Sequence, residues 1–160
     1  SYLFGYTKLT NANTLNKWDV HNVINMNSML SNTDFNGLLN NWDVSNVDNM
    51  EYLFSGTSYF NQPLNNWDVS KVLDMHSMFD NAYSFNQPLN NWNVSEVTNM
   101  IRMFSGASNF NQDLSSWKVG LSTNMSDIFN FSGMSEENYC KIYNSASWQV
   151  KPEMSYTCSP

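Results

Sequence analysis

The stretch "FNQPLNNWDVSKVLDMHSMF", Phe60 to Phe79, is followed after five residues by "FNQPLNNWNVSEVTNMIRMF", Phe85 to Phe104. The two copies differ at few positions, and such a period changes the interpretation of the whole fold. A tryptophan marks every copy, with steps of 24, 25, 25 and 25 residues between Trp18, Trp42, Trp67, Trp92 and Trp117. One such unit cannot bury its own apolar face, whereas stacked copies bury a continuous one, which predicts a solenoid.

Further positions repeat in the same frame as the tryptophan. A leucine stands three residues before it, a valine two after it and a methionine eight after it in all five copies. A second valine stands five after it, at Val23, Val47, Val72 and Val97, but the fifth copy has Ser122 there. A Phe-Asn pair precedes the tryptophan in every copy but the first, at Phe35, Phe60, Phe85 and Phe110.

Each unit has the pattern of a short strand followed by helical turns. In "LNNWDVS", residues 64–70, Trp67 and Val69 flank one polar residue, the alternation of a strand that carries both on one face. From Val72 to Phe79 the apolar residues return at helical spacing, although an irregular or 3₁₀ segment satisfies the same pattern. The sequence therefore predicts a right-handed α/β solenoid with one short parallel strand and a short helix or helical turns per repeat.

The two ends of the chain differ from the repeats between them. "SYLF" at residues 1–4 aligns with "EYLF" at residues 51–54, so we expect the chain to open within a repeat, as a mature or excised fragment. The period stops after Phe129, and Ser135 with Glu136 and Glu137 has the pattern of a capped helix start. We predict a five-rung repeat solenoid over residues 1–130 and a helical C-terminal cap over residues 131–160.

Composition excludes several classes of protein. The 160 residues are a one-domain length, and the formal net charge is −7 with 13% charged residues. No basic stripe exists to neutralise a phosphate backbone, so we do not expect nucleic acid as a partner. No run of about 18 apolar residues occurs, and hence no membrane span is expected in this fragment.

The repeat also resembles a known family. The spacing of Leu64, Trp67, Val69 and Val72 resembles the leucine-rich-repeat pattern with bulkier residues in the strand. The unit "FNQPLNNWDVSKVLDMHSMFDNA" is similar, over about residues 15–130, to the repeat of bacterial surface proteins of the mycoplasma and listerial lipoprotein type, which are grouped with BspA-like leucine-rich repeats. The resemblance implies a surface-displayed repeat protein used in adhesion or host contact, and it brings no catalytic motif.

The residue after each tryptophan forms a polar column beside the predicted strand. It is acidic in the first three copies and becomes Asn93 and then Lys118. A Ca²⁺ ladder on the first three rungs is one interpretation, but Lys118 is incompatible with a cation; the alternative is a solvated polar face without metal, which we adopt. The predicted ligand-facing residues on this face are Asp19, Asn41, Asp43, Ser45, Asn66, Asp68, Ser70, Asn91, Asn93, Ser95 and Lys118.

The remaining columns favour structural roles. The tryptophans share a strand face with valine, so we expect core and not a sugar platform, and methionine beside phenylalanine is expected to fill core space and not to bind Cu(I). An inward asparagine at a corner of a solenoid can bond backbone groups of adjacent turns. We therefore predict a structural ladder of Asn36, Asn61, Asn86 and Asn111.

The sequence contains no motif typical of an enzyme active site. His21 and His76 occupy different places in their repeats, and no nucleophile elbow, phosphate loop or zinc spacing is present. We expect no enzyme activity and no cofactor. Cys140 and Cys158 are predicted to form a structural disulfide, with two buried free thiols as the alternative, and a disulfide indicates an oxidising setting outside the cytoplasm.

Two functional hypotheses follow. The first is an extracellular or cell-surface adhesion module that binds a host or cell-surface protein or glycan through the exposed sheet face. The second is a structural subunit of a surface layer or filament, whose open N-terminal end stacks on another copy by end-to-end self-association.

Overall fold

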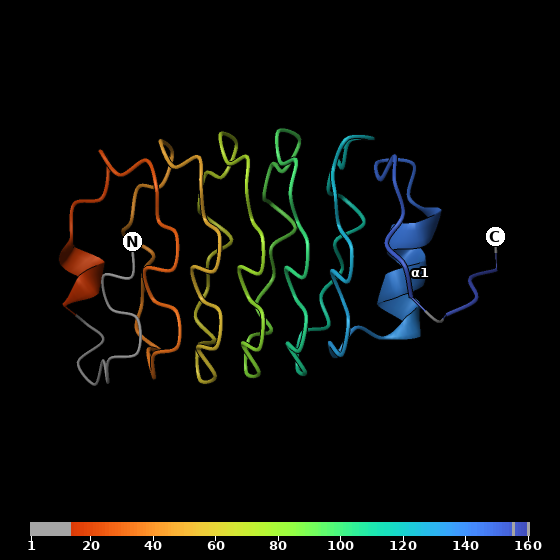
Figure 1. Ribbon diagram of the computed structural model, residues 1–160, viewed down its shortest axis with the longest axis horizontal. Coiled ribbons are helices and arrows are strands. Elements are labelled where there is room, and N and C mark those ends of the chain that lie inside the picture. The colour runs from red at the N-terminus through yellow and green to blue at the C-terminus, as the bar shows by residue number, and fades with distance from the viewer. Residues whose placement is uncertain (1–13, 155, 160) are drawn as a thin grey trace.

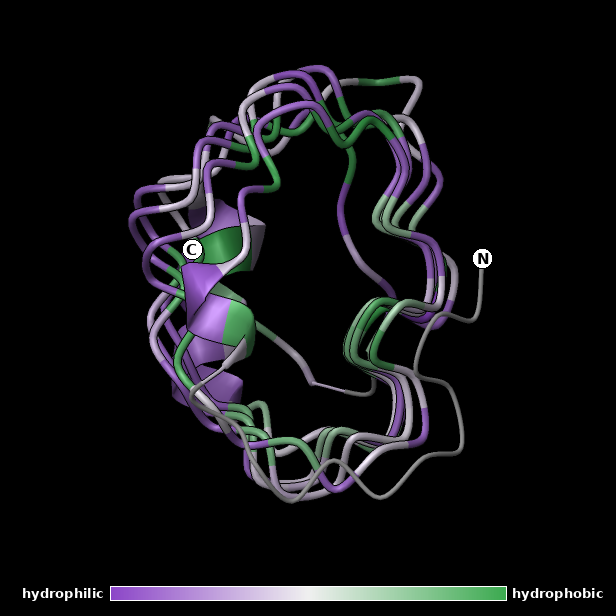
Figure 2. Cartoon of the chain, turned by 90° about the vertical axis from the view of Figure 1, so that its left-hand side faces the viewer, coloured by the Kyte–Doolittle hydropathy of each residue, from purple (hydrophilic) through white to green (hydrophobic). Residues whose placement is uncertain are grey.

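The protein coils in stacked circuits, one for each sequence repeat. The computed structural model describes residues 14–154 and 156–159. Figure 1 shows the circuits side by side along the long axis of the molecule, and the end-on view in Figure 2 shows them overlaid on a common oval outline. We name each circuit after its tryptophan, so that the Trp42 circuit is followed by the Trp67 circuit. Among the described residues, the helices are the 3₁₀ turn η1 (Leu15–Lys17) and the helix α1 (Glu136–Asn144).

The predicted strand in each repeat is wrong. The described part of the chain contains no β-strand, and circuits meet through isolated parallel bridges, one per repeat, at Asn25, Asn49, Asp74, Asn99 and Asn124. Around the tryptophan the backbone turns instead, because the Trp67 N–H donates to the Leu64 carbonyl (3.0 Å) and the Val72 N–H to the Val69 carbonyl (3.0 Å). The predicted alternation of buried and exposed side chains is present, since Trp67 and Val69 are buried and Asp68 is exposed. It arises in a turn and not in a β-strand.

The predicted helix in each repeat is also wrong, so the α/β fold class is overturned. The residue ten after each tryptophan has a left-handed backbone, with φ between 50° and 57° at Ser28, Tyr52, Ser77, Arg102 and Asp127. A left-handed residue interrupts a right-handed helix. The apolar residues on either side still point inward, which explains why their spacing resembled a helical period.

Backbone hydrogen bonds between circuits replace the helical ones. In the Trp42 circuit the N–H groups of Met50, Tyr52, Phe54 and Gly56 donate to carbonyls of the next circuit at 2.9, 2.9, 2.9 and 2.7 Å. The corresponding four donors bond in the same way in the Trp18, Trp67 and Trp92 circuits. All these N–H groups therefore point toward the C-terminal end of the stack, and the carbonyls that receive them point toward the N-terminal end.

The core lies inside the oval and is built from stacked aromatic columns. Trp42 stacks on Trp67 with ring centroids 6.2 Å apart, and Trp92 stacks on Trp117 at 6.4 Å. Each of these indoles also donates from Nε1 to the carbonyl of the leucine in the preceding circuit, for example from Trp92 to Leu64 at 2.9 Å. The prediction of a tryptophan core is confirmed for these four rings, whereas Trp18, in the first described circuit, is 41% exposed.

The C-terminal segment is only partly helical. Ser135 is the N-cap of α1, since its side chain accepts a hydrogen bond from the Asn138 N–H. The helical cap predicted over all of residues 131–160 is wrong, because α1 covers only Glu136–Asn144. The chain beyond α1 returns to the stack, where Trp148 lies 6.1 Å from Trp117 and donates to the Leu114 carbonyl at 2.9 Å. Trp148 therefore continues the core column. The boundary predicted at residue 130 stays a prediction.

Candidate functional site

The predicted ligand-facing residues lie on one exposed side of the circuits. We call this side the polar face and define it by the residues one before, one after and three after each tryptophan. Its acidic column is exposed at Asp19, Asp43 and Asp68, while the valine that follows each of them is buried. Hydrogen bonding to Ser70 lowers the pKa of Asp68, and Asp43 is close enough that its negative charge opposes part of this lowering.

Each acidic side chain on the polar face also shapes its own turn. One Asp43 oxygen accepts the Ser45 N–H (3.1 Å), and one Asp68 oxygen accepts the Ser70 N–H (3.0 Å). Asn93 makes the same bond to Ser95 with its amide oxygen, at 3.3 Å. This bond explains why only Asp or Asn stands at the position in the first four circuits.

Asp43 has the most strongly lowered pKa of the column. Hydrogen bonds from the Ser45 side chain, from His21 and from the Ser45 N–H lower its pKa from the usual 3.8 to about 2, against an opposing effect of burial. The Nδ1 atom of His21 lies 2.8 Å from the second oxygen of Asp43, and both side chains are about half exposed. The pKa of Asp68 is lowered as well, first by its hydrogen bond with Ser70 and further by the charge of Lys71.

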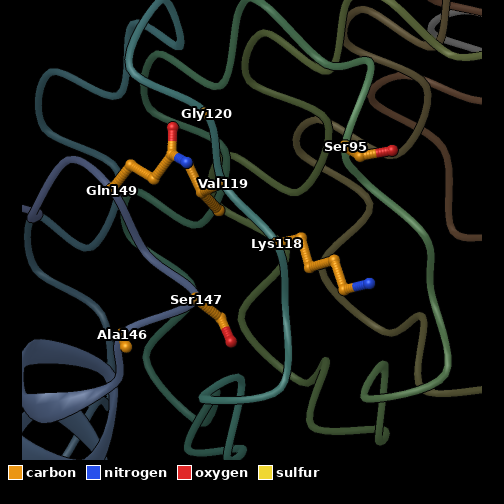
Figure 3. A pocket seen from close by; sticks show the side chains of 7 residues that line it. All are labelled: Ser95, Lys118, Val119, Gly120, Ala146, Ser147 and Gln149. Atoms are coloured by element: carbon orange, nitrogen blue, oxygen red, sulfur yellow. The ribbon is translucent and has the colours of Figure 1, made fainter.

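The polar face is hollowed at its C-terminal end, beside Lys118. An open hollow of about 520 Å³ is lined by Ser95, Lys118, Val119, Gly120, Ala146, Ser147 and Gln149 (Figure 3). An adjoining hollow of about 310 Å³ is lined by Asn91, Trp92, Asn93, Ser95, Ser116 and Lys118. The two share Ser95 and Lys118, and we call them together the Lys118 hollow.

The structure brings only part of the predicted set together. The predicted residues that line the Lys118 hollow are Asn91, Asn93, Ser95 and Lys118. Asn66 lines a separate hollow of about 160 Å³. The remaining candidates line neither part of the Lys118 hollow; they are Asp19, Asn41, Asp43, Ser45, Asp68 and Ser70.

Three residues of the hollow come from the C-terminal segment and were not predicted. Ala146, Ser147 and Gln149 reach the site because Trp148 stacks on Trp117 and the Gln149 N–H donates to the Val119 carbonyl at 2.9 Å. The signal was present in the sequence: Trp148-Gln149-Val150 has the Trp-x-Val pattern of the repeats. Its distance from Trp117 breaks the 25-residue period, which is why it was missed.

The described residues form neither a cluster suited to a metal ion nor a helix long enough to span a membrane. Residues 14–154 and 156–159 contain no group of three or more His, Cys, Asp and Glu placed to hold a metal ion. The two histidines are apart, since His21 pairs with Asp43 while His76 lies against the Tyr52 ring, with centroids 4.9 Å apart. Over the same residues, α1 and η1 are both too short to cross a bilayer.

The predicted asparagine ladder is present in the structure. The side-chain oxygen of Asn36 accepts the Asn61 N–H, that of Asn61 the Asn86 N–H and that of Asn86 the Asn111 N–H, each at 3.0 Å. Asn111 continues the series to the Ser135 N–H at 3.0 Å. The amides are exposed and not inward as predicted, because they line the outer side of the corner while the preceding phenylalanines fill its inner side.

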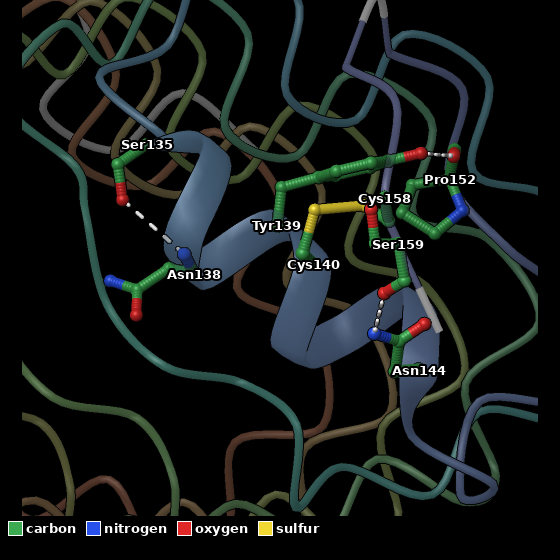
Figure 4. The surroundings of a disulfide bond; sticks show 8 residues. All are labelled: Ser135, Asn138, Tyr139, Cys140, Asn144, Pro152, Cys158 and Ser159. Atoms are coloured by element: carbon green, nitrogen blue, oxygen red, sulfur yellow. Dashed lines mark hydrogen bonds between the residues drawn. A yellow bond between two sulfur atoms is a disulfide. The ribbon is translucent and has the colours of Figure 1, made fainter.

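The predicted disulfide is present too. Cys140 in α1 is bonded to Cys158, and Figure 4 shows the contacts that hold the same segment. The hydroxyl of Tyr139 donates to the Pro152 carbonyl (2.9 Å), and the amide of Asn144 donates to the Ser159 carbonyl (3.1 Å). The disulfide therefore ties the end of the described chain to α1.

Stacked circuits with the same tryptophan, valine and methionine positions define a repeat protein. More particularly, the chain belongs to the family described as "Mycoplasma protein of unknown function, DUF285", which matches residues 1–96 and 66–155. No curated protein and no solved structure matches the chain. The family's function is unknown, so the expectation that the chain is not an enzyme stays a prediction.

Proposed function

We propose that this protein is an extracellular interaction module that binds a protein or a glycan through its polar face. The observation that carries the proposal is the polar face itself, which stays in register over successive circuits and deepens into the Lys118 hollow. A hollow lined by hydroxyl, amide and ammonium groups suits a polar ligand, and the open row beside it offers a longer contact.

Two further features support a position outside the cytoplasm. The Cys140–Cys158 disulfide is compatible with a secreted or surface protein, because such bonds persist in oxidising compartments. The chain's membership of a mycoplasma family agrees with the resemblance of its repeat to repeats of mycoplasma surface proteins. The finer relation to BspA-like and listerial surface proteins, and the adhesive role that it implies, belong to this proposal.

A binding screen with variants of the polar face tests the proposal. The immobilised protein is screened against extracellular matrix proteins and glycans, and each ligand found is measured again with Asp43→Asn/Asp68→Asn and with Ser95→Ala/Lys118→Met. Asparagine keeps the turn-forming oxygen, as Asn93 does, so the first variant changes charge without changing the turn. We expect at least one of the two variants to weaken binding about tenfold.

The matched control removes two negative charges outside the polar face. Asp34→Asn/Glu153→Gln has the same change in net charge as the acidic-column variant, and both of its residues are exposed. We expect its affinity to equal that of the wild type. A ligand that binds all the variants with wild-type affinity would place the interface elsewhere and overturn the proposal.

A structural role is the second candidate, and a different observation favours it. The backbone N–H groups of Met125, Asp127, Phe129 and Phe131 occupy the positions that donate to the next circuit elsewhere, but they have no hydrogen-bond partner among the described residues. Another copy that presents carbonyls to this row would extend the stack. Sedimentation velocity over a wide concentration range tests this, since end-to-end association supports the structural role and a monomer at every concentration counts against it.

A further inference from the structure

Lys118 is a cation at a position that elsewhere carries Asp or Asn. In the four preceding circuits the residue after the tryptophan is Asp19, Asp43, Asp68 and Asn93. The ion pairs of the described residues use His21, Arg102 and Lys141 as the cations and leave the Nζ of Lys118 without a partner. An unpaired ammonium on a chain of net charge −7 is therefore available to an anion from outside.

The groups around Lys118 suit a ligand rich in hydroxyls. The Ser95 and Ser147 hydroxyls and the side-chain amide of Gln149 have no hydrogen-bond partner within the described chain. Hydroxyl and amide groups both donate and accept, as the hydroxyls of a sugar do. Figure 3 shows Lys118 between Ser95 of the preceding circuit and Ser147 of the C-terminal segment, and these residues line the same open hollow as Gln149. Its volume of about 520 Å³ is within the range of small-ligand sites.

No acidic side chain lines the Lys118 hollow among the described residues. Glu96 is exposed and follows Ser95, but it lines neither part of the hollow. In the acidic column, Asp68 is separated from Lys118 by the neutral side chain of Asn93, which belongs to the Trp92 circuit. The carboxylate of Asp113 is engaged with Lys141 at 3.8 Å and lies outside the lining as well.

From this arrangement we infer that the Lys118 hollow binds a carboxylated saccharide. Lys118 contacts the carboxylate through a charge-assisted hydrogen bond, and Ser95, Ser147 and Gln149 bind the sugar hydroxyls. The inference rests on the proposed function, since it names the ligand class for one end of the polar face. An acidic peptide is the competing ligand, but it lacks the hydroxyls that the unpaired groups around Lys118 would satisfy.

Calorimetry with a matched pair of sugars tests the inference. The probes are a hyaluronan tetrasaccharide and the same tetrasaccharide with its carboxyl groups reduced to alcohols. We expect the wild type to bind the acidic form at least about tenfold more tightly than the reduced form, and Lys118→Met to remove this difference. The preference should also shrink as salt is raised.

Lys17→Met is the matched control. Lys17 stands one residue before Trp18 at the other end of the polar face and is exposed, so its loss changes net charge equally without touching the hollow. We expect it to keep the preference for the acidic sugar. Equal binding of the two sugars, an equal loss with Lys17→Met, tighter binding of a tetraglutamate peptide, or no binding of the sugar would each overturn the inference. If a macromolecular ligand still depends on the polar face in such a case, the proposed function stands without it.

Discussion

Asp43 has two roles at the scale of a single residue. One carboxylate oxygen closes a turn with Ser45, and the other meets the ring of His21. Both contacts favour the ionised carboxylate, which is why the pKa of Asp43 lies below its usual value. The same side chain therefore stabilises its own turn and keeps a negative charge on the polar face.

The first prediction concerns the titration of Asp43. Its pKa is lowered from 3.8 to about 2 in the folded chain, so the folded form binds a proton less readily than the unfolded form. The resulting stabilisation is present above about pH 4 and is lost as the pH falls through 2. An NMR titration of the side-chain carboxyl carbon should show this pKa, and Ser45→Ala should raise it. A wild-type value near 4 would contradict the assignment of the hydrogen bonds.

Gly56 shows how closely neighbouring circuits meet at one residue. Its φ of +67° is left-handed, and a Cβ atom built there would collide with the side-chain oxygen of Asn32 in the preceding circuit. Gly106 and Asn81 have the same relation, with φ of +68° at the glycine. Fourteen residues after the first four tryptophans, asparagine and glycine therefore alternate as Asn32, Gly56, Asn81 and Gly106.

The second prediction follows from that contact. Gly56→Ala should lower the free energy of unfolding by about 1–3 kcal/mol, because alanine is strained at positive φ and its methyl group displaces the Asn32 amide. Urea denaturation measures the change. Gly120→Ala is the control, since nothing lies within 4 Å of a Cβ there and its φ is not left-handed. Equal losses in the two variants would contradict this account.

At the scale of the element, the segment that follows each methionine is held by short turns of its own and by hydrogen bonds to the next circuit. Met100, Arg102, Phe104 and Gly106 donate to the carbonyls of the Trp117 circuit at distances between 2.7 and 3.0 Å. The equivalent residues of the Trp117 circuit lack such partners within the described chain. The last circuit therefore has a backbone edge that the inner circuits do not have.

Hydrogen exchange provides the third prediction. The amides of Met125, Asp127 and Phe129 should exchange at least roughly tenfold faster than those of Met100, Arg102 and Phe104. The amides of Ile128 and Asn130 are the internal control, because they donate within the segment at 3.1 and 3.0 Å and should stay protected. Equal protection of the two sets of donors would show that another group covers the edge.

At the scale of the whole molecule, stability should depend on which circuits are adjacent. Each circuit contacts only its neighbours, as expected of a repeat protein, so removing one whole period leaves a shorter stack of the same kind. The alternation of asparagine and glycine makes the outcome depend on which period is removed. When residues 68–92 are removed, Gly56 and Gly106 occupy this position in two adjacent circuits. When residues 43–67 are removed, Asn32 and Asn81 occupy it in two adjacent circuits.

The fourth prediction compares these two deletions. Both remove 25 residues and rejoin the chain after a tryptophan, but only the loss of residues 43–67 forces a Cβ atom onto the amide of Asn32. We expect this deletion to be the less stable by about 1–3 kcal/mol in urea denaturation, and Asn32→Gly to restore it. The reverse order of stability, or no effect of Asn32→Gly, would contradict the contact.

Only part of the candidate site could be predicted from the sequence. The polar face follows from the repeat, because the residue between a buried tryptophan and a buried valine must point outward. The Lys118 hollow does not follow from it, since Ser147 and Gln149 come from a segment outside the period. Only the stacking of Trp148 on Trp117 brings them beside Lys118.

The sequence by itself determined the period and the buried columns, because these depend on which side chains are apolar and how often they recur. It predicted the Cys140–Cys158 disulfide with free thiols as the alternative, and the tertiary structure decided between them by bringing the two residues together. It did not determine the secondary structure. Apolar residues at Val72, Met75 and Met78 suit either a helix or a series of short turns separated by single left-handed residues, and the choice depends on where the backbone N–H groups find acceptors. The next circuit, 25 residues away, supplies those acceptors, so only the tertiary structure decided between the two.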